Sequence, residues 1–194
     1  MATMLEAKPF IESIPLLQVE RKPFSLYKNN NIFLILSGIG KANAAMATAY
    51  TCQKLKPDCI FNLGAAGATD FTYPLGEIFH VVKVFEFDRP KFKSGKPHIH
   101  IPSNLNGFQT ANLATSDKAV LDPEERKMIS KSAGLVDMEG ASIAQACRIF
   151  QTKCLMFKFV SDTPDHICDS YIVENIRLYR KQFYEFLLNS VIKY

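Results

Sequence analysis

Short apolar runs alternate along the chain with longer segments whose apolar residues recur at helical spacing. Residues 32–36 and 59–63 are apolar runs of strand length, and each is followed at once by small or polar residues. Between them, the alanine-rich segment 42–55 predicts a helix that Pro57 ends. This strand–helix–strand order is typical of an α/β protein with a central sheet.

The same alternation continues to the end of the chain. The other predicted elements are strands at residues 76–84, 109–115 and 155–160 and helices at residues 122–132, 139–150 and 171–191. Residues 85–107 are polar and contain prolines, which predicts a loop excursion. We therefore expect one domain over residues 1–194, with a three-layer α/β/α architecture and a central mixed, largely parallel sheet.

Acidic and small residues follow several of these strands. A strand ending near Val136, the helix after it and the strand to residue 160 predict a βαβ unit. Its crossover would leave Glu139 and Asp162 at the carboxyl edge of one sheet, where α/β proteins bind ligands. Gly64 and Ala65 follow another strand, and Glu6 follows the apolar start 1–4, interpreted as the remnant of a first strand. The sequence thus predicts a site at one rim.

Composition and charge exclude some classes of protein but do not indicate a particular reaction. The chain is 47% hydrophobic and 22% charged, with a mean hydropathy of -0.01, as expected for a globular, soluble domain. The net charge of +4 comes without an arginine-rich helix or an aromatic RNA-binding motif, which argues against nucleic acid. No apolar stretch reaches the roughly 18 residues that a membrane span needs. Five cysteines without a CxxC pair favour reduced thiols and a cytoplasmic location.

Each motif taken alone also has a purely structural interpretation. Glycines after a strand often only make a tight turn, and Glu139 near a helix N-terminus is favoured by the helix dipole. Asp162 could be a cap or turn residue beside Pro164. His98 and His100, near Asp88, suggest metal ligands, but a polar loop without a third compact ligand favours solvated side chains and no metal.

As an ordered set, the motifs resemble the nucleoside phosphorylase/nucleosidase superfamily, and most of all its 5′-methylthioadenosine/S-adenosylhomocysteine nucleosidases. The blocks that carry the resemblance are ATMLEA at 2–7, SGIGK at 37–41, NLGAAG at 62–67, LGEI at 75–78, VDMEGA at 136–141 and SD at 161–162. They span nearly the whole chain. The resemblance implies hydrolysis of the N-glycosidic bond of a purine nucleoside, without a cofactor.

The resemblance also implies a role for each acid. Asp162 would donate a proton toward the purine, Glu6 would activate water, and Glu139 would accept hydrogen bonds from the ribose hydroxyls. Ser161 would help to place Asp162, and Lys158 stands where many relatives have arginine. The other residues implied in substrate binding are Asp137, Met138, Gly64, Ala65, Ala119 and Val120. In the loosely matching base segment 115–120, alanine replaces the family's aromatic residue.

Three alternatives remain beside a methylthioadenosine-type hydrolase. Related phosphorylases carry arginine and serine where this chain has Asn62 and Ala65, so water is favoured over phosphate as the nucleophile. A phosphate-dependent phosphorylase, a futalosine-type nucleosidase and a nucleoside-binding protein without turnover stay open. Phe85 and Phe87 lie where relatives often extend aromatic residues into a neighbouring subunit, which predicts a homodimer, while packing of these two rings in the core of the same chain remains the alternative.

Overall fold

The computed structural model describes residues 1–89, 98–166 and 168–192 of the chain. Its helices are α1 (Met4–Ser13), α2 (Lys41–Leu55), α3 (Pro123–Ser130), α4 (Gly140–Ile149) and α5 (Asp169–Ser190). Its strands are β1 (Leu17–Glu20), β2 (Ser25–Asn29), β3 (Ile32–Leu36), β4 (Cys59–Ala68), β5 (Ile78–Glu86), β6 (His98–His100), β7 (Thr110–Thr115), β8 (Leu135–Asp137) and β9 (Lys153–Asp162). None of the described helices is both long and apolar enough to cross a membrane.

The larger sheet closes on itself. Its strand order is β6-β5-β7-β8-β4-β9, and β5 also pairs with β9, so five of its strands form a ring. Among the described pairings, β4–β9, β5–β7 and β7–β8 are parallel, whereas β4–β8, β5–β6 and β5–β9 are antiparallel. The predicted mixed α/β class is therefore confirmed, but parallel pairs do not outnumber antiparallel ones.

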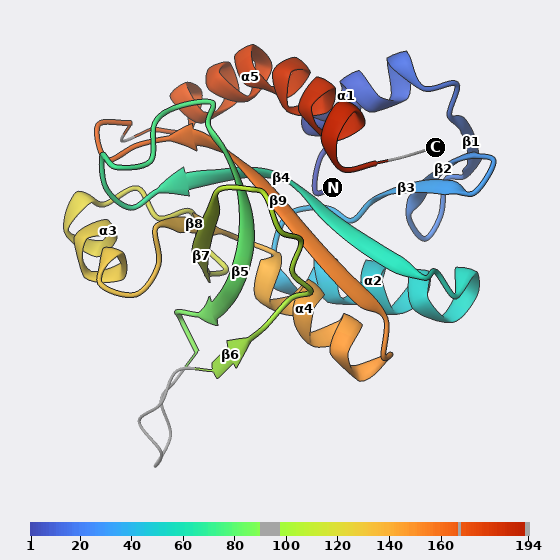
Figure 1. Ribbon diagram of the computed structural model, residues 1–194, viewed down its shortest axis with the longest axis horizontal. Helices are drawn as coiled ribbons and strands as arrows, with labels where there is room; N and C mark the ends of the chain where they lie inside the picture. Colours follow the sequence, from blue (N-terminus) through green and yellow to red (C-terminus); the bar gives the residue numbers. More distant parts are fainter. Residues whose placement is uncertain (90–97, 167, 193–194) are drawn as a thin grey trace.

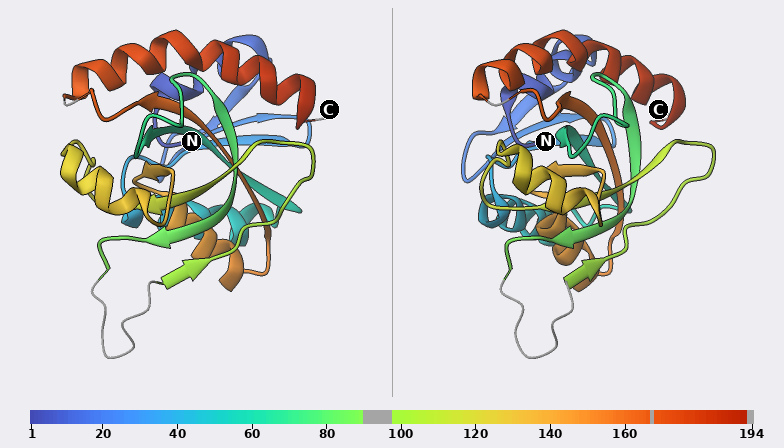
Figure 2. Two further views of the ribbon diagram at one scale, coloured as in Figure 1. Left: turned by 60° about the vertical axis from the view of Figure 1, so that its left-hand side comes forward. Right: turned by 90° about the vertical axis from the view of Figure 1, so that its left-hand side faces the viewer.

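Helices cover both sides of the long strands β4 and β9. Helices α1 and α5 lie on one side, and α2 and α4 lie on the other (Figures 1 and 2). The side chains of β9 alternate between two cores: Met156 packs with α4, whereas Phe157 and Phe159 pack with α1 and α5. Burial on both faces explains why this strand is almost continuously apolar in sequence.

Two strands extend further than their apolar runs predict. β4 continues through Gly64 to Ala68, and β9 includes Ser161 and Asp162. The glycines of β4 do not form turns, so the prediction that they follow the strand is wrong. Their missing side chains instead leave room for two carboxylates: a Cβ atom at Gly64 would lie 2.5 Å from Glu6, and one at Gly67 would lie 2.6 Å from Asp162.

The chain start is helical rather than the remnant of a strand. Helix α1 begins at Met4 after the N-cap Thr3, so Glu6 lies in its first turn. The backbone of the first two residues still pairs with the end of β3, because Ser37 N donates to Met1 O at 3.1 Å and Gly38 N donates to Ala2 O at 3.0 Å. The pattern also missed the antiparallel sheet β1-β2-β3 that precedes this pairing.

The predicted parallel βαβ unit around α4 is also wrong in its topology. Strand β4 lies between β8 and β9 and runs antiparallel to β8. In this register Gly67 of β4 lies opposite Val136 on one side and Asp162 on the other. The carboxyl ends of three strands therefore still meet, which places the segment after Val136 beside Asp162 as the sequence indicates.

Candidate active site

A cavity of about 490 Å³ opens where β4, β8 and β9 end and where the start of α1 meets them. Nine of the eleven residues that the sequence singles out line it. They are Glu6, Ala65, Ala119, Val120, Asp137, Met138, Glu139, Ser161 and Asp162. Gly64 and Lys158 do not line the cavity, but each lies against a residue that does.

Both oxygens of the Glu6 carboxylate accept hydrogen bonds that hold the side chain in place. Its Oε2 accepts hydrogen bonds from Thr3 N at 3.0 Å and Thr3 Oγ1 at 2.8 Å, which forms a capping box with the Thr3 side chain. Its Oε1 accepts a hydrogen bond from Ala65 N at 2.9 Å. The helix start therefore fixes a buried carboxylate against strand β4, close to the cavity.

Glu139 comes between β8 and α4 and is the N-cap of that helix, although its side chain does not cap it. Its Oε1 accepts a hydrogen bond from Gly40 N at 2.8 Å, at the turn between β3 and α2. Burial raises the pKa of Glu139 to about 7, and the carboxylate of Asp137 adds to this effect, while Lys158 and Gly40 N–H oppose it. Its protonation therefore changes near neutral pH.

Asp137 and Lys158 form a buried ion pair beneath the cavity floor. Lys158 Nζ lies 2.8 Å from Asp137 Oδ2, and their side chains are 3% and 1% exposed. Burial alone would lower the pKa of Lys158, but the carboxylates of Asp137, Glu139 and Glu6 raise it above its ordinary value. Asp137 also accepts a hydrogen bond from Thr115 Oγ1 at 2.7 Å. Its oxygens are thus engaged within the protein.

Asp162 is bonded on both carboxylate oxygens. Ser161 Oγ donates to Oδ1 at 2.5 Å, and Arg126 Nη2 forms an ion pair with Oδ2. The sequence prediction included Ser161 and missed Arg126, which lies on α3. A signal for it exists, because Arg126 occupies the same inward face of the helix as Ile129, where an apolar residue is expected.

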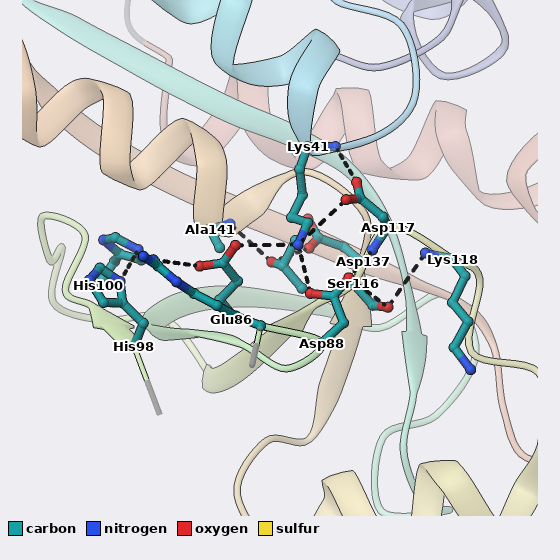
Figure 3. A network of polar contacts seen from close by, with 12 residues as sticks. Lys41, Glu86, Asp88, His98, His100, Ser116, Asp117, Lys118, Asp137 and Ala141 are labelled. Atoms are coloured by element: carbon teal, nitrogen blue, oxygen red, sulfur yellow. Dashed lines mark hydrogen bonds and ion pairs between the residues drawn. The ribbon is translucent and has the colours of Figure 1, made fainter. Parts of the chain in front are cut away.

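Residues 118–120 of the base segment predicted at 115–120 line the cavity, and Lys41 binds the segment through Asp117. The ammonium group of Lys41 lies among three carboxylates, at 2.6 Å from Asp88, 3.3 Å from Glu86 and 3.5 Å from Asp117 (Figure 3). Lys41 N also donates to Asp117 Oδ1 at 3.0 Å. Ala119 is exposed, and its side chain is only a methyl group.

The two histidines of the predicted loop lie on the short strand β6. His98 Nδ1 is 3.1 Å from His100 Nε2 (Figure 3), and Asp88 bonds to Lys41 instead of turning toward them. His100 is buried, so the expectation that both are solvated is wrong for it. Burial lowers the pKa of His100, and His98 adds to the effect. Residues 90–97 of the predicted excursion 85–107 lie outside the described residues.

Known proteins are similar to this chain in sequence. A 5′-methylthioadenosine/S-adenosylhomocysteine nucleosidase of Bacillus velezensis is 33% identical over 161 residues, covering 70% of each chain. A protein of the same name from Buchnera aphidicola is 29% identical over 185 residues, covering 83% of this chain and 80% of the relative.

Solved structures agree with this chain in fold. A 5′-methylthioadenosine/S-adenosylhomocysteine nucleosidase of Neisseria meningitidis in complex with methylthio-immucillin-A has a TM-score of 0.84 at 23% identity, covering 96% of this chain and 94% of that one. A futalosine hydrolase mutant of Helicobacter pylori has a TM-score of 0.85 at 19% identity, with the same coverage.

A family model also matches almost the whole chain. It is described as the phosphorylase superfamily, and its matches cover residues 2–123 and 105–192. These matches contain all the blocks that carry the acids of the cavity. The chain therefore belongs to the phosphorylase superfamily.

Proposed function

We propose that this protein hydrolyses the N-glycosidic bond of purine nucleosides of the methylthioadenosine/S-adenosylhomocysteine type and releases the free base. The observation that carries the proposal is the convergence of Glu6, Glu139 and Asp162 around one cavity, each held by hydrogen bonds from a different element. The names of the sequence relatives support the substrate class.

Glu139 and Met138 bind the sugar. The Glu139 carboxylate lines the cavity and has one oxygen bonded to Gly40 N, which leaves the other free to accept hydrogen bonds from ribose hydroxyls. Met138 lines the cavity beside it and packs against the sugar ring. These contacts hold the ribose while the bond to the base breaks.

Asp162, in its protonated form, donates the proton that the departing base needs and is left as a carboxylate, which pairs with Arg126. Cleavage of an N-glycosidic bond leaves electron density on the purine, and protonation of the base at N7 makes it a better leaving group. Asp162 lines the cavity beside the backbone of Ala119 and Val120, where the base lies. Ser161 orients the carboxylate through its hydrogen bond of 2.5 Å.

Glu6 positions the water that attacks the sugar carbon. Glu6 is far from Asp162 in the sequence. Its buried carboxylate is fixed by hydrogen bonds from Thr3 N and Ala65 N. A carboxylate in this state accepts a proton from water as the oxygen attacks. The general acid and the general base are then separate residues, because one gives a proton to the purine while the other takes a proton from water.

Water is favoured over phosphate by the surroundings of Glu6. A phosphate dianion needs free N–H groups or cations, yet Ala65 N already donates to Glu6. A phosphate placed there would also face the Glu6 carboxylate, and like charges repel at short range. Ala65 supplies no hydroxyl group to compensate, so we assign hydrolysis.

The decisive experiment follows release of free base from methylthioadenosine, S-adenosylhomocysteine, adenosine, inosine and futalosine, with and without phosphate. We expect cleavage of the first two without phosphate. Cleavage only with phosphate would show a phosphorylase, and binding without base release would show a nucleoside-binding protein. Asp162→Asn should bind substrate and lose turnover, while near-normal turnover would remove Asp162 from its role.

We further propose that residues 1–194 act as one domain, that the protein works in the cytoplasm and that two copies form a homodimer. The five cysteines are free, which suits a reducing compartment. Phe87 is 37% exposed, and Ile39, which lines the cavity, is 54% exposed, which suits contact of these apolar side chains with a second subunit. Sedimentation analysis should give twice the mass of the chain, and a monomeric mass would contradict the dimer.

A further inference from the structure

Arg126 is the largest side chain with less than 2% exposure among the described residues. Burial of a guanidinium is costly unless hydrogen bonds and an opposite charge compensate it. All three nitrogen atoms of this group are engaged. Nε donates to Val120 O at 2.8 Å, Nη1 donates to Ala68 O at 2.6 Å, and Nη2 pairs with Asp162 Oδ2.

The three acceptors belong to three different segments: Val120 and Asp162 line the cavity, and Ala68 directly follows Gly67, which lines it. Val120 lies in the base segment, Ala68 ends strand β4, and Asp162 ends strand β9. A guanidinium is planar, so its N–H groups point in fixed directions. Bonds from one such group therefore fix the positions of all three acceptors relative to one another.

Strand β4 is shaped to admit this arrangement. A Cβ atom at Gly67 would lie 2.6 Å from Asp162 Oδ2 and 3.2 Å from Arg126 Nη2. The ion pair thus occupies the space that any other residue at position 67 would fill. Helix α3 supplies the arginine because its N-cap Asp122 starts the helix directly after the base segment, which turns Arg126 inward.

We propose that Arg126 is a positioning residue that holds the Asp162 carboxylate at a fixed place relative to the backbone of the base segment. The inference rests on the proposed role of Asp162 as proton donor. Proton transfer requires donor and acceptor atoms within about 3 Å of each other, and an error of about 1 Å costs up to about 100-fold in rate. Arg126 also lines the cavity, but protein acceptors engage all three of its guanidinium nitrogen atoms, so it acts through Asp162 rather than on the substrate.

The test compares Arg126→Ala with Arg126→Lys in steady-state kinetics with methylthioadenosine. We expect kcat of Arg126→Ala to fall about 100-fold while KM changes by less than about threefold, because a misplaced donor affects the chemical step. Lysine keeps a cation but cannot bond all three acceptors, so its kcat should be intermediate. Gly67→Ala should lower kcat in the same way from the other side of the ion pair.

Chemical rescue separates positioning from a general structural role. Arg126→Ala leaves a cavity of guanidinium shape, so added guanidinium, at concentrations that do not change wild-type activity, should restore part of kcat. The matched control is Arg180→Ala, which removes a half-buried arginine that donates to Leu5 O at 2.7 Å and is not paired with Asp162. Guanidinium should not stimulate this control.

Three results would overturn the inference: normal kcat in Arg126→Ala, a change confined to KM, or a folded Arg126→Ala protein that guanidinium does not stimulate. If circular dichroism shows that Arg126→Ala is unfolded, Arg126→Lys and Gly67→Ala decide, and normal kcat in both overturns it. Asp162→Asn distinguishes the two proposals. An inactive Asp162→Asn beside a normal Arg126→Ala rejects only the positioning role, whereas an active Asp162→Asn rejects the proton donor itself.

Discussion

Gly64 provides the space in which the carboxylate of Glu6 lies, since a Cβ atom at position 64 would be 2.5 Å from Glu6 Oε1. The neighbouring N–H of Ala65 donates to the same oxygen at 2.9 Å. The missing side chain of Gly64 and the hydrogen bond from Ala65 together allow Glu6 of α1 to lie directly against strand β4. This contact joins the start of α1 to β4 at the edge of the cavity.

Gly64→Ala should therefore displace Glu6 while keeping the fold. The added methyl group meets the far end of a flexible side chain, which moves more easily than backbone. We expect kcat to fall about as far as in Glu6→Gln, by about 100-fold, because the attacking water loses its acceptor. Steady-state kinetics and circular dichroism check both parts, and a folded Gly64→Ala protein with normal kcat would contradict the role of Glu6.

Substrate binding should weaken as the pH falls below about 7, since the pKa of Glu139 is raised to about 7. In its proposed role the ionised carboxylate of Glu139 accepts hydrogen bonds from two ribose hydroxyls, whereas the protonated form has less acceptor capacity. KM measured from about pH 5.5 to pH 8.5 should rise at the acid end of this range. A KM that is constant over the range would remove Glu139 from ribose binding.

The same raised pKa predicts a pH-dependent effect on stability. Because the pKa of Glu139 in the folded state exceeds its ordinary 4.5, the folded protein favours the protonated form. That contribution to stability is complete below about pH 4.5 and is lost as the pH rises to about 7. Glu139→Gln mimics the protonated form, so its melting temperature should exceed that of the wild type at pH 8 and approach it at pH 5. An equal difference at both pH values would contradict the prediction.

Lys158→Met should destabilise the protein strongly. It leaves the buried Asp137 without its cation, and breaking a buried pair costs about 3–5 kcal/mol of unfolding free energy. In urea denaturation, the double variant Lys158→Met/Asp137→Asn should lose less free energy of unfolding than the two single variants lose in sum. The exposed pair of Lys181 and Glu185 is the control, and Lys181→Met should change stability by less than about 0.5 kcal/mol. Equal losses at both pairs would contradict the buried ion pair.

Ala119→Phe should tighten binding of the base. Ala119 is exposed at the cavity wall, and an aromatic ring there can stack on a purine. Such contacts contribute about 0.5–1.5 kcal/mol, so KM should fall by about 2- to 10-fold. Ala42→Phe places the same ring at an exposed site outside the cavity and should leave KM unchanged. If both variants behave alike, the base does not lie beside Ala119.

The strand–helix alternation predicted most of the long elements because β9 and α5 carry strong local patterns. It did not predict that β5 also pairs with β9, since closure of the sheet depends on contacts between residues distant in sequence. The helical start of the chain escaped detection because the five residues before Glu6 are too few to show a period. Their capping box, Thr3 with Glu6 three residues later, was the available signal.

The candidate site was predicted more completely than the topology that forms it. Glu6, Glu139 and Asp162 were named from their blocks, and they line one cavity although the βαβ unit expected to gather them is absent. Arg126 was not predicted as their neighbour, because a single arginine on a short helix is usually solvated, although its place on the same face of α3 as Ile129 was an available signal. Only the position of α3 against the end of β9 reveals its pairing.

Two consecutive backbone N–H groups, those of Gly40 and Lys41, bind Glu139 and Asp117 respectively. One peptide segment therefore contacts both the residue that we propose to bind the sugar and the segment that we propose to bind the base. A substrate whose base pushes the segment of Asp117 outward would also pull on the hydrogen bond of Glu139. Changes made to fit a different base should consequently alter the affinity for the sugar as well, so that the two halves of the nucleoside cannot be selected independently.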